Sequence, residues 1–197
     1  MLFSNLFGKK GGGQGEAPKR RALLASAPVT VSNSVKADLM AAVRAIYELH
    51  PGEVEFVYQA ALRSIAGGRD VAGLQRVLMG LTATRFTERR AGHVARYLND
   101  RALSVMTDER QAAQGLTQAI WTYSGTPCFA DSRNPTDADK AQDAAHRAAD
   151  REVYAVGKGL LVNRIWTLPG HEDGCRCVSK SLISGVEGLA PRRIAKP

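Results

Sequence analysis

The sequence has little cysteine, few aromatic residues and no long apolar run. It contains three cysteines and 6% Phe, Trp and Tyr in 197 residues. A small, odd number of thiols argues against the disulfide framework of a secreted domain. No segment approaches the roughly 20 apolar residues that span a bilayer, and the first ten residues run from apolar to basic, the reverse of a secretory signal. We therefore expect a cytoplasmic protein without a membrane partner.

The sequence also lacks the motifs of common catalytic sites. The glycines at 11–13 are not followed by the Gly-Lys-Ser/Thr ending of a phosphate-binding loop, and no strand pattern precedes them. Neither paired catalytic carboxylates nor a nucleophile–base constellation stands at a familiar spacing. These absences favour a binding or structural protein over an enzyme, with no small-molecule substrate.

The positive charge is concentrated at the two ends of the chain. The net charge is +8, and residues 37–188 carry equal numbers of basic and acidic side chains, 18 of each. We interpret residues 1–31 as a flexible, Gly-rich basic tail and 189–197 as a second basic tail. Mobile basic tails attract phosphate or acidic protein surfaces, although they can also serve solubility alone. The candidate contacts to double-stranded DNA or an acidic partner are Lys9, Lys10, Lys19, Arg20, Arg21, Arg192, Arg193 and Lys196.

Residues 32–118 show the periodicity of amphipathic helices. Apolar residues at helical spacing predict helices over 34–49, 53–66 and 70–81, and a long one from Thr87. Ser34 is the expected N-cap of the first helix. The long helix carries several arginines, but acidic residues are interspersed with them (Asp100, Asp108 and Glu109). This mixture favours a solvated face over nucleic-acid binding by the helix.

The pattern changes after Gly115. Residues 119–124 and 176–183 alternate in the period of a strand, and the two segments are expected to pair. An Ala-rich helix is predicted from Thr136 or Asp137 to about Ala149, and 151–174 is expected to be irregular apart from a short strand at 164–167. The prediction is an α+β fold, in which a helical region (32–118) precedes a small C-terminal domain (119–188) with a short antiparallel sheet and one helix.

The C-terminal half contains an uncommon combination of residues. A Pro-Gly pair, Pro169-Gly170, precedes Cys175-Arg176-Cys177, while Trp121, His146 and Asp150 lie upstream. In this order, and with Arg110-Gln111, Gly115, Ser124 and Tyr154, the pattern resembles the C-terminal domain of phage head-morphogenesis proteins, the Mu F-like minor head family. The resemblance covers roughly residues 85–185. The chain departs from the family pattern in having Thr126-Pro127-Cys128 after the Trp strand, Arg151 after Asp150, and Gly174 before the first cysteine of the pair.

The resemblance implies a protein of the phage head interior. Members of this family enter the procapsid in few copies, commonly bound to the portal, and influence assembly or the handling of packaged DNA. By resemblance, the partners of this chain are the portal and other head proteins, and its location is the host cytoplasm during assembly and then the head of the virion. The residues carried over as structural parts of the family motif are Trp121, Asp150, Trp166, Pro169, Gly170 and Arg176.

All three cysteines lie in the last 70 residues and suggest a metal site. If the predicted strands pair, Cys128 lies just beyond one strand and the Cys175–Cys177 pair at the start of the other, with His146 on the helix packed over them. Three thiolates and one imidazole make a closed tetrahedral zinc shell, which would stabilise a small, aromatic-poor domain. Alternatively, these residues pack as small buried groups without metal.

Two further alternatives concern the tryptophans and the function. Trp121 and Trp166 are interpreted as core anchors; the alternative, base stacking, requires exposed rings beside basic groups. The alternative to a head protein is a zinc-dependent enzyme acting on nucleic acid, with Asp150 and His171 near the metal. Such an enzyme needs an open coordination position and a general base.

Overall fold

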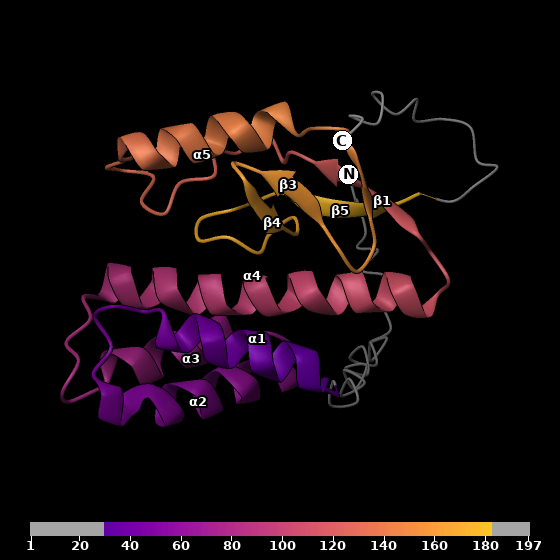
Figure 1. The fold of residues 1–197 in the computed structure, drawn as a ribbon. Coiled ribbons are helices and arrows are strands. Elements are labelled where there is room, and N and C mark those ends of the chain that lie inside the picture. The colour runs from indigo at the N-terminus through magenta and orange to yellow at the C-terminus, as the bar shows by residue number, and fades with distance from the viewer. Residues whose placement is uncertain (1–29, 183–197) are drawn as a thin grey trace, which may run out of the picture.

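The computed structural model describes residues 30–182, in which a layer of helices packs against a small α+β unit. The helical layer comprises α1 (Asn33–Arg44), α2 (Val54–Ala66) and α3 (Val71–Met79), with a short 3-10 turn at Pro51–Glu53, and it packs on one side of the long helix α4 (Glu88–Ala113). The C-terminal unit lies on the other side of α4 (Figure 1). Its elements are β1 (Gln118–Thr122), α5 (Asp137–Ala148), β2 (Val153–Ala155), β3 (Leu160–Val162), β4 (Ile165–Thr167) and β5 (Val178–Ser181). The predicted α+β class is confirmed.

The helical layer is held together by aliphatic burial. Its amphipathic helices direct one apolar stripe each toward α4, and the stripe of α4 itself faces them. Leu39, Leu78 and Leu98 are completely buried, one each from α1, α3 and α4. Of the buried side chains in this core, 18 are hydrophobic and none is aromatic, as the low aromatic content of the sequence predicted.

Side-chain caps fix where the helices begin. Thr87 accepts a hydrogen bond from the Arg90 N–H and starts α4, and Thr136 forms a reciprocal capping box with Asp139 at the start of α5. The first helix was predicted from the wrong cap: Ser32, not Ser34, accepts the Val35 N–H. The Ser34 hydroxyl instead donates to Glu109 on α4, a long-range contact that local pattern cannot show.

The end of the first helix differs from the prediction. α1 ends at Arg44, and residues 45–49 form turns although Ile46 and Leu49 are buried at the expected helical spacing. The turn closes on Thr84, whose hydroxyl accepts the His50 N–H at 2.7 Å. α4 continues through residues 107–109, because the Asp108 carboxylate accepts the Gly157 N–H (3.1 and 3.0 Å) in the C-terminal unit and does not cap a new helix.

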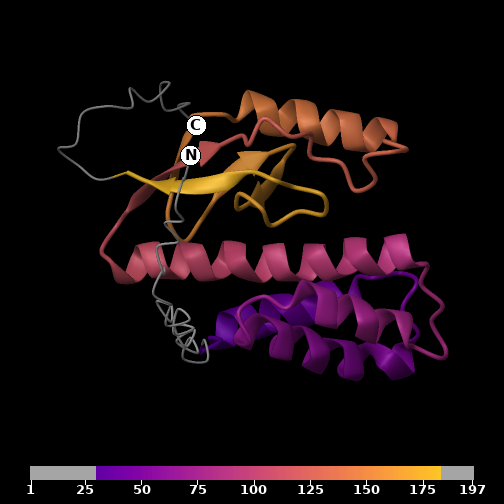
Figure 2. The same ribbon diagram turned by 180° about the vertical axis from the view of Figure 1, so that it is seen from behind.

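β1 is the central strand of a three-stranded antiparallel sheet. It pairs with β5 from Ala119–Ser181 to Thr122–Val178, which confirms the predicted pairing of the two strand segments, and with β2 from Gln118–Ala155 to Ile120–Val153. The sheet lies between α4 and α5, as the view from behind shows (Figure 2).

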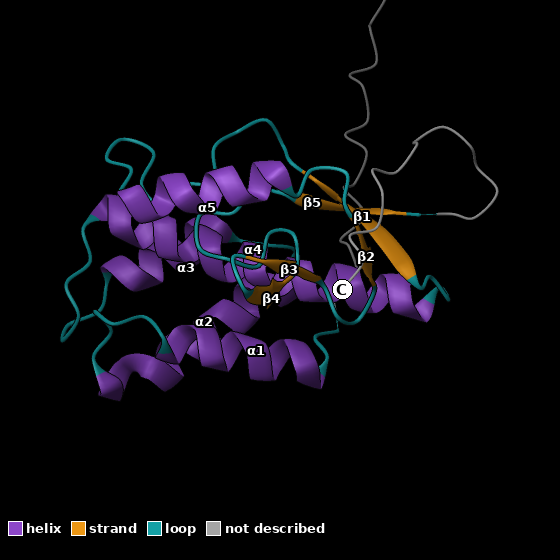
Figure 3. Ribbon diagram, turned by 45° about the horizontal axis from the view of Figure 1, so that its top comes forward, coloured by secondary structure: helices purple, strands orange, loops and turns teal. Residues whose placement is uncertain are grey.

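Residues 151–174 are more regular than predicted. Besides β2, they contain the antiparallel pair β3–β4, joined by Asn163 and Arg164, both at positive φ (49° and 66°). Two consecutive positive-φ residues are typical of the tight hairpin turn that matches strand twist. β4 confirms the short strand predicted at 164–167, whereas β2 and β3, with three residues each, are too short for alternation to be recognised. Figure 3 shows this hairpin beside the main sheet.

The basic tail residues lie outside the described part of the chain. Residues 1–29 and 183–197 contain all the predicted tail contacts, so the structure does not bear on those predictions. Within 30–182, no helix combines the length and apolar character required to cross a membrane.

Candidate metal centre

Three separate segments bring the cysteines and the histidine together. Cys128 follows β1, Cys175 and Cys177 precede β5, and His146 lies in the last turn of α5. Since Thr122 at the end of β1 pairs with Val178 at the start of β5, the antiparallel register places the two cysteine segments side by side. The structure therefore brings together all four predicted ligands.

The geometry of the four side chains fits a tetrahedral metal ion. One ligand atom from each of the four lies within 4.8 Å of every other. The Sγ atom of Cys177 is 3.8 Å from the Sγ of Cys128 and 3.8 Å from Nδ1 of His146. Two sulfurs bound tetrahedrally at about 2.3 Å from zinc are about 3.8 Å apart. This buried group can bind a metal.

Burial of the group is nearly complete. Cys128 and His146 have no exposed surface, and Cys175 and Cys177 are each 4% exposed. A coordination shell with this burial has no side open to water or substrate, which is the property of structural rather than catalytic metal sites.

The thiols and the imidazole perturb one another's protonation. Hydrogen bonds from Cys175 and Cys177 outweigh burial and lower the pKa of Cys128, whereas donating to Cys128 and Cys175 raises the pKa of Cys177. Burial opposes the charged form of His146, but the contacts with Cys128, Cys175 and Glu172 prevail and raise its pKa to about 11.

Backbone N–H groups point at two of the sulfurs. The Gly170 N–H donates to Cys175 Sγ at 3.3 Å, and the Arg176 N–H donates to Cys128 Sγ at 3.4 Å. Donors of this kind stabilise a thiolate. Gly174 lets the backbone of the Cys175 segment lie close to the backbone that follows Cys128. Its φ is +72°, and a Cβ there would lie 2.4 Å from the carbonyl carbon of Phe129.

Trp121 and Glu172 hold the His146 ring on either side. Trp121 is completely buried and meets the imidazole edge to face, with ring centroids 5.3 Å apart. The Nε2 atom of His146 is buried without a hydrogen bond and lies 3.3 Å from Oε2 of Glu172. A metal-binding histidine usually directs its second nitrogen at a carboxylate. Glu172 was not predicted in this role, and its place next to the Asp-Gly-Cys segment is the only sequence signal for it.

Asp143 ties the cysteine loop to α5. Its carboxylate accepts the Cys128 N–H and the Tyr123 hydroxyl, each at 2.8 Å, and pairs with Arg147. These donors outweigh burial and lower the pKa of Asp143. Asp143 was not predicted as a site residue, although it stands three positions before His146 and therefore on the same face of the helix.

The other motif residues also make structural contacts. Asp150 accepts the Tyr123 N–H at 2.9 Å, and the Pro169 carbonyl accepts the Ser104 hydroxyl of α4 at 2.8 Å. Gly170 has a φ of +85°, and the Arg176 side chain is exposed. Gln111 of the Arg-Gln pair donates to Ser179 on β5 at 2.9 Å. These contacts join α4, β1 and β5.

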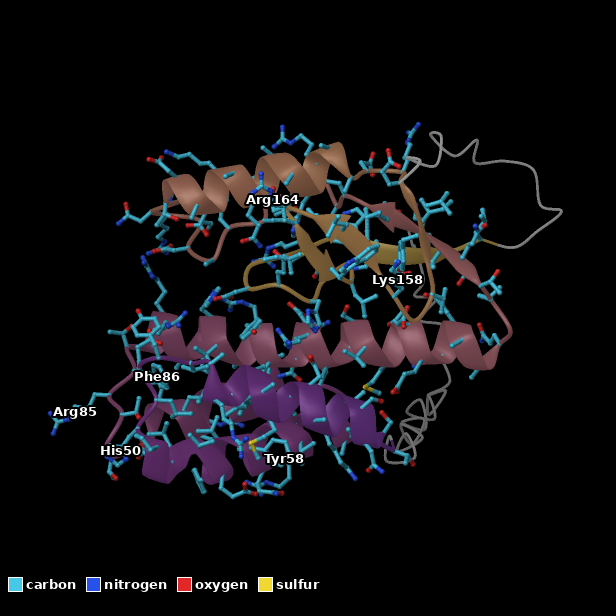
Figure 4. The ribbon with its side chains drawn as sticks, viewed as in Figure 1. His50, Tyr58, Arg85, Phe86, Lys158 and Arg164 are labelled. Carbon is cyan, nitrogen blue, oxygen red and sulfur yellow. The ribbon has the colours of Figure 1, made fainter. Side chains whose placement is uncertain are left out.

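Trp166 was wrongly predicted as a core anchor. It lies on β4 and is 52% exposed, because the small β3–β4 hairpin has an outer face that no other element covers within residues 30–182. The ammonium of Lys158 (labelled in Figure 4) lies 4.1 Å from the centre of its ring. His171 also lies away from the cluster, with Nε2 3.1 Å from Asp38 on α1. Only Trp121 of the two tryptophans packs against the metal-binding group.

Comparison with known proteins adds no relative: no protein-family model, no curated protein and no solved structure matches this chain.

Proposed function

We propose that this chain is a minor head protein of a bacteriophage, acting in head morphogenesis through protein contacts, and that a structural zinc ion stabilises its C-terminal unit. The observation that carries the proposal is the convergence of three residues of the motif, His146, Cys175 and Cys177, with Cys128 at one buried point. Residues of the motif that resembles the Mu F-like family are thus far apart in sequence but build one folding unit.

Zinc is the metal that this ligand set suits best. Thiolate-rich sites disfavour magnesium and calcium, which require oxygen ligands, and tetrahedral sites of sulfur and nitrogen are typical of zinc. The buried, closed group supports a structural role, since a catalytic zinc needs a position open to substrate. The alternative of a zinc-dependent enzyme acting on nucleic acid gains no support from this geometry.

The motif residues support assembly rather than chemistry. Trp121, Asp150, Pro169 and Gln111 each contact another segment of the chain. Through the family resemblance we propose the portal and other head proteins as partners, with the basic tails contacting the portal or packaged DNA.

Incorporation into procapsids tests the assembly role. The full chain, with an affinity tag, would be co-produced with the portal, scaffold and major capsid proteins of its phage, and purified procapsids would be assayed for it. We expect a few copies per procapsid for the intact chain and for Asn134→Ala, which changes an exposed side chain of the same unit outside the motif. Cys175→Ser should be incorporated poorly. Absence of the intact chain from procapsids would refute the proposed role.

A further inference from the structure

The acidic residues of α4 do not neutralise its arginines. Asp100 pairs with Arg69 from the helical layer, and Asp108 accepts a backbone N–H of the C-terminal unit. Glu109 accepts the hydroxyls of Ser32 and Ser34. Asp100, Asp108 and Glu109 are therefore engaged in tertiary contacts, whereas the fourth carboxylate of α4, Glu88, is exposed.

Arginines from two parts of the chain meet at one cleft. A cleft of about 370 Å³ lies between the N-terminal part of α4 and the loop 129–133, and its lining includes five arginines and one carboxylate, Asp131. The N-terminal ends of α4 and α5 lie on the same side of the molecule (Figure 1). The arginines of the cleft are Arg89, Arg90, Arg96, Arg133 and Arg176.

Three of these arginines have no acidic partner. Arg89 pairs with Asp131, and Arg90 forms a bidentate pair with Glu48. Arg96, Arg133 and Arg176 are exposed and, within residues 30–182, have no carboxylate oxygen within 4.0 Å. Three guanidinium groups are thus available to a ligand.

The metal-binding loops position the basic side of this cleft. Arg176 stands between the ligands Cys175 and Cys177, and its N–H donates to Cys128 Sγ. The loop that carries Arg133 follows Cys128 directly, and its Ala130 N–H donates to Asp139 at 3.0 Å. The backbone on both sides of the cleft is therefore fixed by the buried core of the C-terminal unit, which reduces the entropy cost of holding a ligand.

The cleft continues as a groove along α4. Two further hollows share Arg176 with this cleft, and together the three extend from Thr87 to Thr107 of the helix. Their linings add two carboxylates, Asp100, which pairs with Arg69, and Glu172, which faces His146. Twenty helical residues cover about 30 Å. A single small anion would occupy one end of such a groove, whereas a polymer can follow it.

We propose that this groove binds the phosphodiester backbone of a nucleic acid, with Arg96, Arg133 and Arg176 as phosphate contacts. Guanidinium groups match phosphate oxygens with two parallel hydrogen bonds, and duplex DNA presents one charge per about 1.7 Å of its axis. The proposal deepens the proposed head function and rests on it only for naming packaged DNA as the partner. It locates DNA contact on the folded body in addition to the tails.

Binding of a labelled 20-base-pair duplex (about two helical turns) by the full chain, followed by fluorescence anisotropy, tests the groove. The triple variant Arg96→Gln/Arg133→Gln/Arg176→Gln should bind at least about tenfold more weakly at low salt, and the slope of log affinity against log salt should fall by about 2 to 3, at about 0.9 per phosphate lost. The matched control is the triple variant Arg63→Gln/Arg110→Gln/Arg164→Gln, which changes three exposed arginines outside the groove.

Three outcomes would overturn the proposal. The groove plays no part if the triple variant and the control lose affinity and salt slope equally. Polyglutamate that competes as well as duplex DNA, charge for charge, would assign the groove to an acidic protein. Inorganic phosphate that displaces the duplex at equal phosphate concentration would reduce it to a single-anion site. Circular dichroism identical to wild type excludes misfolding, and failed procapsid incorporation with intact DNA binding would refute only the head role.

Discussion

The two layers of the molecule use different means to stay folded. The helical layer buries a cluster of 18 hydrophobic side chains, whereas the corresponding cluster of the C-terminal unit has eight members, of which three are the cysteines. Apolar burial stabilises a fold at roughly 25 cal/mol per Å², so the second layer has much less of this term. Buried Asp139, Asp143 and His146 replace it with hydrogen bonds and a metal-binding group. The comparison teaches that a unit too small for an apolar core can depend on coordination.

Metal removal should have the largest effect, and it should destabilise the C-terminal unit far more than the helical layer. Structural zinc contributes about 10–16 kcal/mol to folding of small domains, more than most domains have in total stability. We expect a chelator, or Cys177→Ser, to unfold the C-terminal unit while the helical layer persists. Both tryptophans lie in that unit, so a red shift of their emission with most helical circular dichroism retained would be the signature. Unchanged emission after complete metal loss would contradict the prediction.

Leu98→Ala should affect the other layer. Leu98 of α4 is completely buried in the aliphatic core, and truncating such a residue costs about 2–5 kcal/mol. Urea unfolding followed at 222 nm should show this loss, with metal content unchanged. Leu103→Ala, on the same helix at a side chain 41% exposed, should cost less than about 1 kcal/mol. Equal costs for the two variants would mean that the core does not hold α4 in place.

Asp38→Asn tests the connection between the layers. The Asp38 carboxylate on α1 accepts hydrogen bonds from Nε and Nη2 of Arg101, each at 2.7 Å, and its Oδ1 lies 3.1 Å from Nε2 of His171 in the C-terminal unit. Burial opposes ionisation, but these partners lower the pKa of Asp38 from 3.8 to about 2. Such a shift corresponds to about 2 kcal/mol of stability, which Asp38→Asn should remove at neutral pH.

The pH dependence of that loss has a fixed sign. Because the folded-state pKa is depressed, the ionised carboxylate stabilises the fold above pH 3.8, and this contribution disappears as the pH falls toward 2. The difference in unfolding free energy between wild type and Asp38→Asn should therefore be present above about pH 5 and shrink below it. Asp137→Asn, at a carboxylate that is 99% exposed, should show no comparable pH-dependent difference.

Glu172→Gln should have the smallest effect, a loss of metal affinity at the candidate metal centre. Glu172 faces Nε2 of His146, and loss of such a carboxylate weakens metal binding by about 10–100-fold. Competition with a chromophoric chelator measures this affinity. Glu152→Gln, at a partly exposed carboxylate of the same unit outside the metal-binding cluster, should bind metal like the wild type. If both variants bind equally well, Glu172 does not position the histidine.

The sequence determined most of the secondary structure because its signals are local. Hydrophobic spacing gave α2, α3 and α4 nearly to their ends, and Thr87, Asp70 and Thr136 act as caps through hydrogen bonds three residues away. It also indicated the four candidate metal ligands, because cysteine is scarce and two predicted strands placed the thiols together. The strand at 164–167 was predicted and corresponds to β4, whereas the first cap and the strands β2 and β3 were missed. A contact to Glu109 and pairing with β1 or β4 decide these.

Only the tertiary structure decided which residues complete the sites. Glu172 meets His146 across 26 residues of sequence, and the exposure of Trp166 follows from the position of a hairpin at the edge of the unit. The acids that accompany the α4 arginines in sequence are turned toward other segments, and Arg133 and Arg176 are added to the same cleft by the folding of the C-terminal unit. Sequence fixes charge and spacing along one element, whereas the electrostatics of a groove depend on every element that borders it.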